Sequence, residues 1–229
     1  MNNIAILLAG GTGKRFGSFV PKQYLPVNGK MIIEYSLEAL FSSTCIDGII
    51  TVADEYSRTA YLNKVCQHPK HLGFAAPGET RQLSIYNALV FIEEKNLRPE
   101  NVFIHDAARP YLTDKMISDY IEAIKGHEGV LPVLPMKDTI YFSNDKKSID
   151  SLLDRSCLFA GQAPEVFRFA AYLKANKRLL PDEIKLINGS TEPAFKAGMD
   201  VIMVEGNEKN FKITSKEDME RFEQCVRGF

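Results

Sequence analysis

Short apolar runs alternate along the chain with longer segments in which apolar residues recur at helical spacing. The runs predict strands over residues 4–8, 48–53, 72–76, 102–105, 130–133 and 201–204. The helical spacing predicts helices over residues 30–42, 55–67, 80–95, 114–125 and 164–178. A capping box from Thr214 to Glu217 predicts a last helix that runs to about Val226. Apolar runs without polar alternation are typical of strands buried on both faces of a parallel sheet.

This alternation of strands and helices predicts an α/β fold in which helices flank a mostly parallel, doubly wound sheet. The 229 residues are enough for a single domain with a substantial core. Sheets of this kind bind ligands beyond the carboxyl ends of their strands. The loop after the first strand and Asp106, which follows the strand 102–105, both fall at that edge. We therefore expect the functional site there.

Residues 136–162 depart from this pattern and predict a projecting β-arm. Apolar β-like pieces at residues 140–142 and 149–153 flank a polar turn. An isolated two-stranded ribbon is only marginally stable in water, so the arm needs a surface to lie against. The same arm of a second subunit is the simplest such surface, and we expect a homodimer. The alternative is an exposed disordered loop, which the apolar side chains disfavour.

Composition and charge exclude several classes of function. The 28 basic and 29 acidic residues leave a net charge of −1, so no overall field attracts nucleic acid or an anionic membrane. The four cysteines lie far apart without a C-x-x-C pair, which argues against a zinc site or a disulfide framework. The apolar run near the N-terminus is too short for a signal peptide or a membrane span. We expect a cytoplasmic protein whose anion site is local.

The segment from Leu7 to Tyr24 carries the strongest functional pattern. A strand end runs into four glycines, which let the backbone approach a ligand and direct its N–H groups inward: Gly10, Gly11, Gly13 and Gly17. Three cations lie in the same segment: Lys14, Arg15 and Lys22. Backbone donors and clustered cations suit the negative charges of a polyphosphate, so the segment predicts nucleotide binding.

Two better-known phosphate loops do not match this segment. A Walker-type loop requires Ser or Thr after its Gly-Lys pair, whereas Gly13 and Lys14 are followed by Arg15. The dinucleotide fingerprint requires a third glycine where this chain has Phe16. A turn that merely connects a strand to a helix would explain the glycines but would leave the three cations unexplained.

The sequence HDAARP, residues 105–110, places the carboxylate of Asp106 at a predicted strand end. Mg²⁺ prefers one or two carboxylates together with water and phosphate oxygens, so Asp106 is sufficient for a metal–triphosphate complex. Asp106 could instead form a turn in which it pairs with Arg109. His105 is a weaker candidate, because a histidine at a strand end is more often packed or hydrogen-bonded than catalytic.

Two further segments carry weaker signals. The helix predicted over residues 80–95 begins next to Gly78, and its N–H groups and the Ser84 hydroxyl could read a base edge. Lys212 lies beyond a predicted strand and just before the last helix. Lysines in such positions are usually solvated, so the pattern alone leaves its role open.

The motifs LAGGTGKRFG, PKQY, HDAARP, DT at residues 138–139, and VEGNEKNFKIT occur in this order over nearly the whole chain. In this combination the chain resembles the 2-C-methyl-D-erythritol 4-phosphate cytidylyltransferases, which act in isoprenoid precursor synthesis, and the related ribitol 5-phosphate cytidylyltransferases. The resemblance implies a Rossmann-like nucleotidyltransferase domain with a β-arm that interlocks in a homodimer.

The resemblance also implies a role for each motif. The glycine loop would wrap the triphosphate of CTP through Leu8, Ala9, Gly10, Gly11 and Gly13. Arg15, Lys22 and Lys212 would be the catalytic cations, and Asp106 would bind the nucleotide and hold Mg²⁺. Gly78, Arg81 and Ser84 would lie against the cytosine and its ribose. Thr139 and Arg155 on the arm would grip the phosphate of the acceptor, across the dimer interface.

In the implied reaction, a phosphate oxygen of a polyol phosphate attacks the α-phosphorus of CTP in line, and pyrophosphate leaves. The phosphate nucleophile is already ionised at neutral pH, so no general base is required. Catalysis would then consist of positioning and of electrostatic stabilisation by the cations.

The match is weaker on the acceptor side. Residues 188–193 stand where the family usually has a Thr-Asp pair, and residues 162–165 stand where it has a Thr-Pro-Gln run. Residues 107–108 favour the methylerythritol branch, because ribitol enzymes often carry Ser-Val there. We expect 2-C-methyl-D-erythritol 4-phosphate as the acceptor, with ribitol 5-phosphate or another alditol phosphate as the alternative. A catalytically silent nucleotide-binding module is a further alternative, which the combination of Arg15, Lys22, Asp106 and Lys212 disfavours.

Overall fold

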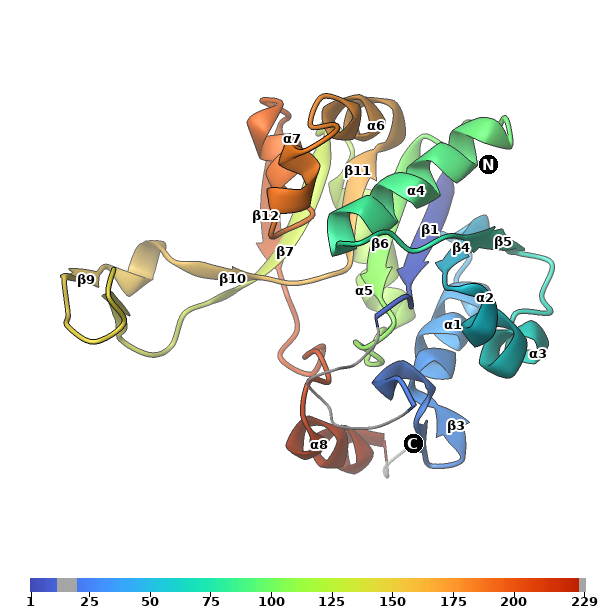
Figure 1. Cartoon of the computed structure of the whole chain (residues 1–229), viewed down its shortest axis with the longest axis horizontal. Helices are drawn as coiled ribbons and strands as arrows, with labels where there is room; N and C mark the ends of the chain where they lie inside the picture. The colour runs from blue at the N-terminus through green and yellow to red at the C-terminus, as the bar shows by residue number, and fades with distance from the viewer. Residues whose placement is uncertain (12–19, 227–229) are drawn as a thin grey trace.

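The computed structural model describes residues 1–11 and 20–226. Within these residues, a central sheet is covered by helices, and a long arm projects from one side of the molecule (Figure 1). The predicted class, an α/β fold with a mostly parallel sheet, is confirmed.

The central sheet has eight strands. They are β1 (Asn3–Leu8), β4 (Gly48–Val52), β5 (His71–Ala75), β6 (Asn101–Asp106), β7 (Gly129–Pro135), β10 (Phe159–Gly161), β11 (Glu165–Arg168) and β12 (Val201–Glu205). β1 pairs in parallel with β4 and β6, β4 pairs in parallel with β5, and β12 pairs in parallel with β7. β11 lies antiparallel between β6 and β7, and β10 is antiparallel to β7.

The side chains of β1 alternate between two hydrophobic cores. Ala5 and Leu7 belong to the core formed with α1 (Ile32–Ser42) and α5 (Asp114–Ala123). Ile4 and Ile6 belong to the core formed with α4 (Arg81–Glu94) and α6 (Phe169–Lys177). All four side chains are fully buried, as expected for an apolar strand covered on both faces.

The prediction of one helix over residues 164–178 is wrong in its first part. Residues Glu165–Arg168 form β11, and the helix α6 begins only at Phe169. Val166 pairs with Phe103 of β6 on one side and with Val130 of β7 on the other. The periodicity of a short apolar segment does not distinguish a buried strand from a helix, and here the pairing with two neighbouring strands decides the conformation.

The last helix, α8 (Lys216–Val226), lies at the predicted place, but its capping box is shifted by one residue. The carboxylate of Asp218 accepts hydrogen bonds from the backbone N–H groups of Thr214 and Ser215. The hydroxyl of Ser215 accepts one from the N–H of Asp218. The reciprocal pair is therefore Ser215 with Asp218, not Thr214 with Glu217.

The remaining elements are short. They are η2 (Lys22–Tyr24), β2 (Pro26–Val27), β3 (Lys30–Met31), α2 (Glu55–Ser57), the π-helical η3 (Arg58–Leu62), α3 (Asn63–Val65), η4 (Arg155–Cys157), η5 (Glu183–Leu186) and α7 (Glu192–Lys196). The helix predicted over residues 55–67 is thus divided among α2, η3 and α3. No helix among residues 1–11 and 20–226 has the length and apolar character that crossing a membrane requires.

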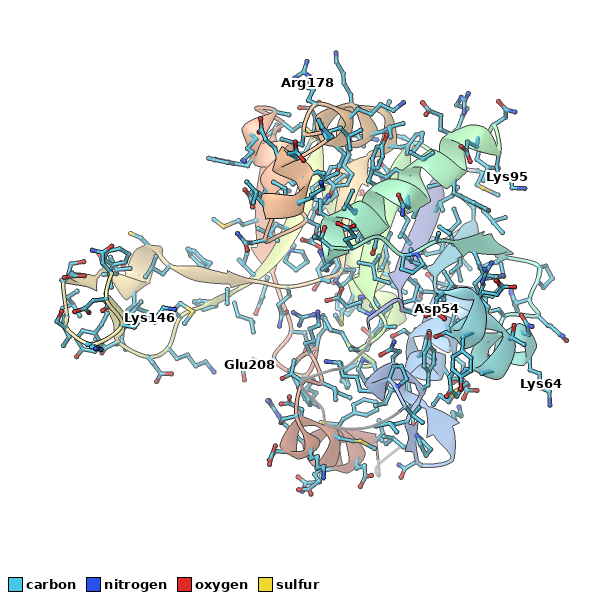
Figure 2. All side chains as sticks on the ribbon, in the orientation of Figure 1. Asp54, Lys64, Lys95, Lys146, Arg178 and Glu208 are labelled. Carbon is cyan, nitrogen blue, oxygen red and sulfur yellow. The ribbon has the colours of Figure 1, made fainter. Side chains whose placement is uncertain are left out.

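The arm leaves the sheet after β7 and returns through β10 (Figure 1). It carries a separate two-stranded sheet of β8 (Ile140–Phe142) and β9 (Ser151–Leu153), and Lys146 lies on it well away from the central sheet (Figure 2). Large apolar side chains on the arm are exposed: Tyr141, Phe142, Ile149, Leu152, Leu153 and Phe159. A hairpin is therefore present where the sequence predicts it, while its role in dimerisation stays a prediction.

Candidate active site

The carboxyl ends of β1 and β6 meet at one edge of the sheet, because Leu8 is the register partner of Asp106. The N–H of Ala107 donates to the Leu8 carbonyl at 3.0 Å, which ties the chain after β6 to the end of β1. A Cβ atom on Gly10 would lie 2.6 Å from the Cβ of Pro77, so a side chain there would collide with that residue. The glycine loop thus begins between β6 and the segment that leads into α4.

The described part of the glycine loop is anchored by η2. The Gln23 amide donates to the carbonyls of Ala9 and Gly11 at 2.7 and 2.8 Å, and the Tyr24 hydroxyl donates to the Ala9 carbonyl at 3.1 Å. Both side chains are buried. The N–H of Ala9 donates to the Val52 carbonyl at 2.9 Å, so both polar backbone groups of Ala9 are hydrogen-bonded within the protein. The start of the glycine loop is therefore fixed in place by β4 and η2.

The role of Gln23 was not predicted from the sequence, although its position beside Lys22 in PKQY was a usable signal. Lys22 is the first residue of η2 and is half-buried. It therefore lies next to the residue that anchors the loop. The predicted phosphate ligands Gly13 and Arg15 lie outside the described residues.

Gly78 and Ser84 are hydrogen-bonded to each other at the start of α4. The Ser84 hydroxyl accepts a hydrogen bond from the Gly78 N–H at 3.0 Å and donates one to the Thr80 carbonyl at 2.9 Å. A Cβ atom on Gly78 would lie 2.4 Å from the Cβ of Leu83. In the structure the hydroxyl fixes the loop in front of α4, while its contact with a base edge stays a prediction.

Three cations from separate segments converge on Asp106. The Arg81 Nε lies 3.0 Å from Oδ1, the Lys212 Nζ lies 2.9 Å from Oδ2, and the Arg109 Nε lies 3.8 Å from Oδ2. Burial alone would raise the pKa of Asp106, but the positive charges of Arg81 and Lys212 outweigh it and hold the pKa far below its usual range. Asp106 is therefore ionised throughout the physiological range of pH.

A second buried carboxylate adjoins this cluster. Glu165, the first residue of β11, places Oε2 3.5 Å from Nη2 of Arg81. Ser190 accepts a hydrogen bond from Nη1 of Arg81 at 2.7 Å and donates one to Oε1 of Glu165. Burial raises the pKa of Glu165, although Arg81 and Ser190 both favour its ionised form. Both segments differ from the family pattern, but nothing in the sequence predicted that they meet at Arg81.

The segment that carries Lys212 is fixed to the chain after β6. Arg109 donates from Nη1 to the Asn210 carbonyl at 2.7 Å, and the N–H of Ile213 donates to the Ala108 carbonyl at 2.8 Å. Asn210 is fully buried and donates from its amide to the Ala163 carbonyl at 2.6 Å. Lys212 is held between these contacts, so its position beside Asp106 is set by the backbone and not by the side chain alone.

His105 is packed beneath the cluster. Its side chain is fully buried, and burial lowers its pKa to about 4. The ring is therefore neutral at pH 7, and Nε2 donates to the Arg109 carbonyl at 2.9 Å. This contact shapes the turn after β6 and agrees with the packed role that the sequence favoured.

The oxygen donors of this cluster decide whether it could hold a divalent cation. The described residues contain no group of three or more His, Cys, Asp or Glu side chains that could hold a metal ion. Asp106 supplies one ionised carboxylate at the site edge, which is the number that Mg²⁺ requires when phosphate and water oxygens complete its shell. The residues present therefore fit a cation delivered together with a polyphosphate.

The acceptor residues predicted on the arm are not brought to this cluster within one chain. Thr139 is exposed, and Arg155 donates from Nη1 to the Lys137 carbonyl at 2.6 Å. Among the described residues, neither side chain forms a hydrogen bond or ion pair with Asp106, Arg81 or Lys212. In Figure 1 the arm extends away from the sheet.

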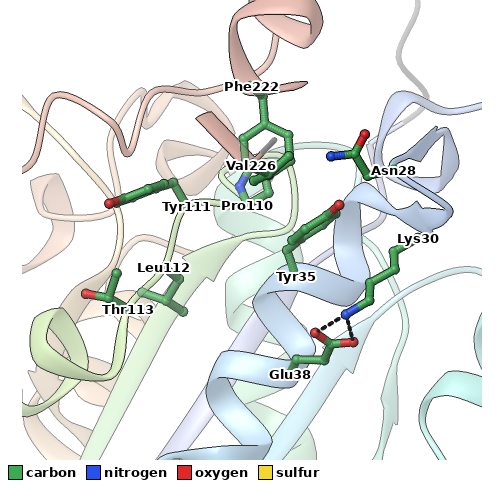
Figure 3. A pocket seen from close by; sticks show the side chains of 10 residues that line it. All are labelled: Asn28, Lys30, Tyr35, Glu38, Pro110, Tyr111, Leu112, Thr113, Phe222 and Val226. Atoms are coloured by element: carbon green, nitrogen blue, oxygen red, sulfur yellow. Dashed lines mark hydrogen bonds and ion pairs between the residues drawn. The ribbon is translucent and has the colours of Figure 1, made fainter. Parts of the chain in front are cut away.

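A separate pocket of about 480 Å³ lies between α1, the segment after β6 and α8 (Figure 3). Its walls include the rings of Tyr35, Tyr111 and Phe222, and an ion pair between Lys30 and Glu38 lies at its side. Neither Asp106 nor any cation that contacts it lines this pocket. The anionic ligand is therefore expected at the Asp106 cluster and not here.

A family model described as "IspD: 2-C-methyl-D-erythritol 4-phosphate cytidylyltransferase" matches residues 3–228. The 2-C-methyl-D-erythritol 4-phosphate cytidylyltransferase of Thermotoga neapolitana is 36% identical over 218 residues, which cover 95% of this chain and 94% of that relative. This chain belongs to the IspD family. It is therefore a nucleotidyltransferase, and the resemblance inferred from the ordered motifs is confirmed.

Two other similarities bear on this IspD-family enzyme. The ribitol-5-phosphate cytidylyltransferase of Vibrio parahaemolyticus is 34% identical over 230 residues, which cover 98% of this chain and 95% of that relative. The crystal structure of the Francisella tularensis 2-C-methyl-D-erythritol 4-phosphate cytidylyltransferase matches with a TM-score of 0.82 at 28% identity, covering 99% of this chain and 100% of that chain. The fold thus agrees with the family, and both acceptor classes occur among the relatives.

Proposed function

We propose that this enzyme transfers CMP from CTP to 2-C-methyl-D-erythritol 4-phosphate and releases pyrophosphate, a step in isoprenoid precursor synthesis. The observation that carries the proposal is the convergence of Arg81, Arg109 and Lys212 on the buried carboxylate of Asp106. This cluster stands beside the glycine loop at the carboxyl edge of the sheet. A polyphosphate placed there meets backbone donors on one side and fixed cations on the other.

The acceptor phosphate attacks the α-phosphorus of CTP, and the bond to the pyrophosphate oxygen breaks in line with the attack. Lys212 and Lys22, together with Arg15, stabilise the negative charge that accumulates on the phosphoryl oxygens. Arg81 and the loop at Gly78 hold the nucleoside. Because the side chain of Lys212 is fixed before the substrates bind, little reorganisation accompanies the reaction.

We further propose that Mg²⁺ binds at Asp106 together with the triphosphate. When bound, Mg²⁺ would neutralise phosphate charge and orient the phosphate oxygens. Asp106 contributes the carboxylate oxygen, and the ion pairs with Arg81 and Lys212 keep that carboxylate ionised and fixed in place.

A cytoplasmic homodimer is proposed as the active form. The exposed apolar side chains of β8 and β9 would be covered by the partner's arm, since an isolated ribbon with such a surface is unfavourable in water. In the dimer, Thr139 and Arg155 of one subunit would bind the acceptor phosphate in the site of the other. The extension of the arm away from its own sheet supports this arrangement (Figure 1).

The choice of acceptor rests on family membership and on Ala107 and Ala108, which are both buried beside Asp106. Ribitol 5-phosphate is kept as the second candidate, because a ribitol-5-phosphate cytidylyltransferase is 34% identical to this chain. Both acceptors present a phosphate to the same cations, so the cluster by itself does not separate them.

The test is pyrophosphate release by the purified protein with CTP, Mg²⁺ and one acceptor at a time. We expect the highest kcat/KM with 2-C-methyl-D-erythritol 4-phosphate and loss of activity when UTP or ATP replaces CTP. A higher kcat/KM with ribitol 5-phosphate would overturn the choice of acceptor. No release with any alditol phosphate, together with tight CTP binding by calorimetry, would instead favour a catalytically silent module.

A further inference from the structure

The guanidinium of Arg81 is engaged on three sides by three different parts of the chain. Nε donates to Asp106 at the end of β6, Nη1 donates to Ser190 in the turn before α7, and Nη2 faces Glu165 at the start of β11. A planar guanidinium that is held by groups from several elements has one allowed orientation. The position of Arg81 is therefore fixed by the tertiary structure.

Glu165 is the unusual member of this arrangement. Its side chain is 8% exposed, and Oε2 has no hydrogen-bond partner in the described structure apart from its ion-pair contact at 3.5 Å with Arg81. Oε1 accepts hydrogen bonds from the hydroxyls of Ser190 and Thr191. A buried carboxylate is costly unless it is paired, so the contact with Arg81 is what accommodates Glu165 in this interior position.

The carboxylates of Asp106 and Glu165 both contact Arg81 but differ in their other cationic neighbours. Asp106 faces Arg81, Lys212 and, at 3.8 Å, Arg109, while the one ion pair of Glu165 among the described residues is with Arg81. Without the charge of Glu165, the whole guanidinium of Arg81 would be attracted to Asp106, where Lys212 already occupies Oδ2. Glu165 thus attracts Nη2 of Arg81 toward β11, while Nε of Arg81 stays on Oδ1 of Asp106 and Lys212 keeps Oδ2.

We propose that Glu165, assisted by Ser190, is a positioning residue that fixes the orientation of the Arg81 guanidinium for the nucleotide. The inference rests on the proposed cytidylyl transfer. The expected effect of Glu165 is on the binding of CTP, through Arg81.

The first test is the isosteric variant Glu165→Gln, with CTP affinity measured by calorimetry and kcat and KM measured at saturating acceptor. We expect the dissociation constant and KM for CTP to rise about tenfold, since one charged contact to the guanidinium is lost. The kcat at saturating CTP is expected to fall by less than about threefold, because Glu165 does not touch the reacting atoms. Ser190→Ala should show a smaller change of the same kind.

The second test is a double-mutant cycle with Arg81→Met. If Glu165 acts through Arg81, then Glu165→Gln changes CTP affinity by less than about twofold in the Arg81→Met background. A merely structural role would leave the full tenfold effect in both backgrounds, which would overturn the proposal. An unchanged CTP affinity in the single variant would overturn it as well. If Glu165→Gln does not fold, the same cycle with Ser190→Ala decides between these outcomes.

The matched control is Glu100→Gln. Glu100 precedes β6 and pairs with Arg168 at the end of β11 opposite Glu165, so this variant also removes a carboxylate from an Arg–Glu pair that involves β11. Its CTP affinity is expected to equal that of the wild type. If the proposed function is wrong, the wild-type protein will release no pyrophosphate. The double-mutant cycle is measured on CTP binding, so it still tests the role of Glu165 in that case.

Discussion

The Nζ of Lys212 lies 2.9 Å from Oδ2 of Asp106, although the two residues are 106 positions apart in the chain. The contact is formed because the segment before α8 crosses the end of β6, where the N–H of Ile213 donates to the Ala108 carbonyl. The Asp106 side chain is buried, and the Lys212 side chain is only 36% exposed, so water screens their attraction less than it would on the surface. Lys212 is thereby held ready at the site edge instead of moving freely in solvent.

Lys212→Met should lower kcat on the order of 10²- to 10³-fold, with a smaller change in the KM for CTP, because the lysine stabilises charge that develops in the transition state. Steady-state measurement of pyrophosphate release checks this. The control is Lys209→Met, whose ammonium lies over the Tyr111 ring at 5.6 Å from its centroid and forms no contact with Asp106. Equal losses in both variants would contradict a specific role for Lys212.

Gln23→Ala should raise the KM for CTP about tenfold, because the Gly11 carbonyl loses the Gln23 donor and the Ala9 carbonyl keeps only Tyr24. The loop is then free to turn its carbonyls toward the phosphates. Gln67→Ala, which removes the same side chain at an exposed position after α3, is the control and should leave KM unchanged. A wild-type KM in Gln23→Ala would show that η2 does not organise the loop.

The stability of the protein should fall as the pH decreases from about 6.5 to about 4. Burial lowers the pKa of His105 from 6.5 to about 4, so in this range the unfolded state binds a proton that the folded state does not. The free energy of unfolding should decrease by roughly 3 kcal/mol from this group over the whole range. Urea unfolding at a series of pH values measures the slope.

The matching variant is His105→Gln, which removes the titrating ring. Its pH slope between 6.5 and 4 should be smaller than that of the wild type. It should not vanish, because burial also lowers the pKa of His71, which contributes with the same sign. An identical slope in the variant and the wild type would mean that His105 is accessible to protons in the folded state.

The arm should set the oligomeric state. Phe142→Ser combined with Leu152→Ser removes two exposed apolar side chains from β8 and β9 and should convert a dimer to a monomer, measured by light scattering at micromolar concentration. Activity should fall when the dimer is lost, because Thr139 and Arg155 of one subunit then have no partner site to reach. Leu186→Ser removes a leucine that is 74% exposed on η5 and should leave the dimer intact. A dimer that survives the double substitution would place the interface elsewhere.

Some of the site follows directly from local sequence patterns. The apolar runs at β1 and β6 locate two strand ends, and in a parallel sheet those ends lie at the same edge, so the loop after Leu8 and the residue Asp106 are expected together. The pattern of β11 is different. Its four residues precede a helix without a break, and only the backbone pairing with β6 and β7 makes them a strand.

The hydrophobic pattern of this chain determined the α/β class, the edge of the sheet that carries the site and the presence of a projecting hairpin, because strand and helix periodicity are local properties. The tertiary structure alone decided that Lys212 pairs with Asp106 and that Glu165 and Ser190 share the guanidinium of Arg81. These contacts join segments separated by up to 109 positions. Burial of opposite charges between such distant segments is a property of the assembled fold, and no periodicity in the sequence encodes it.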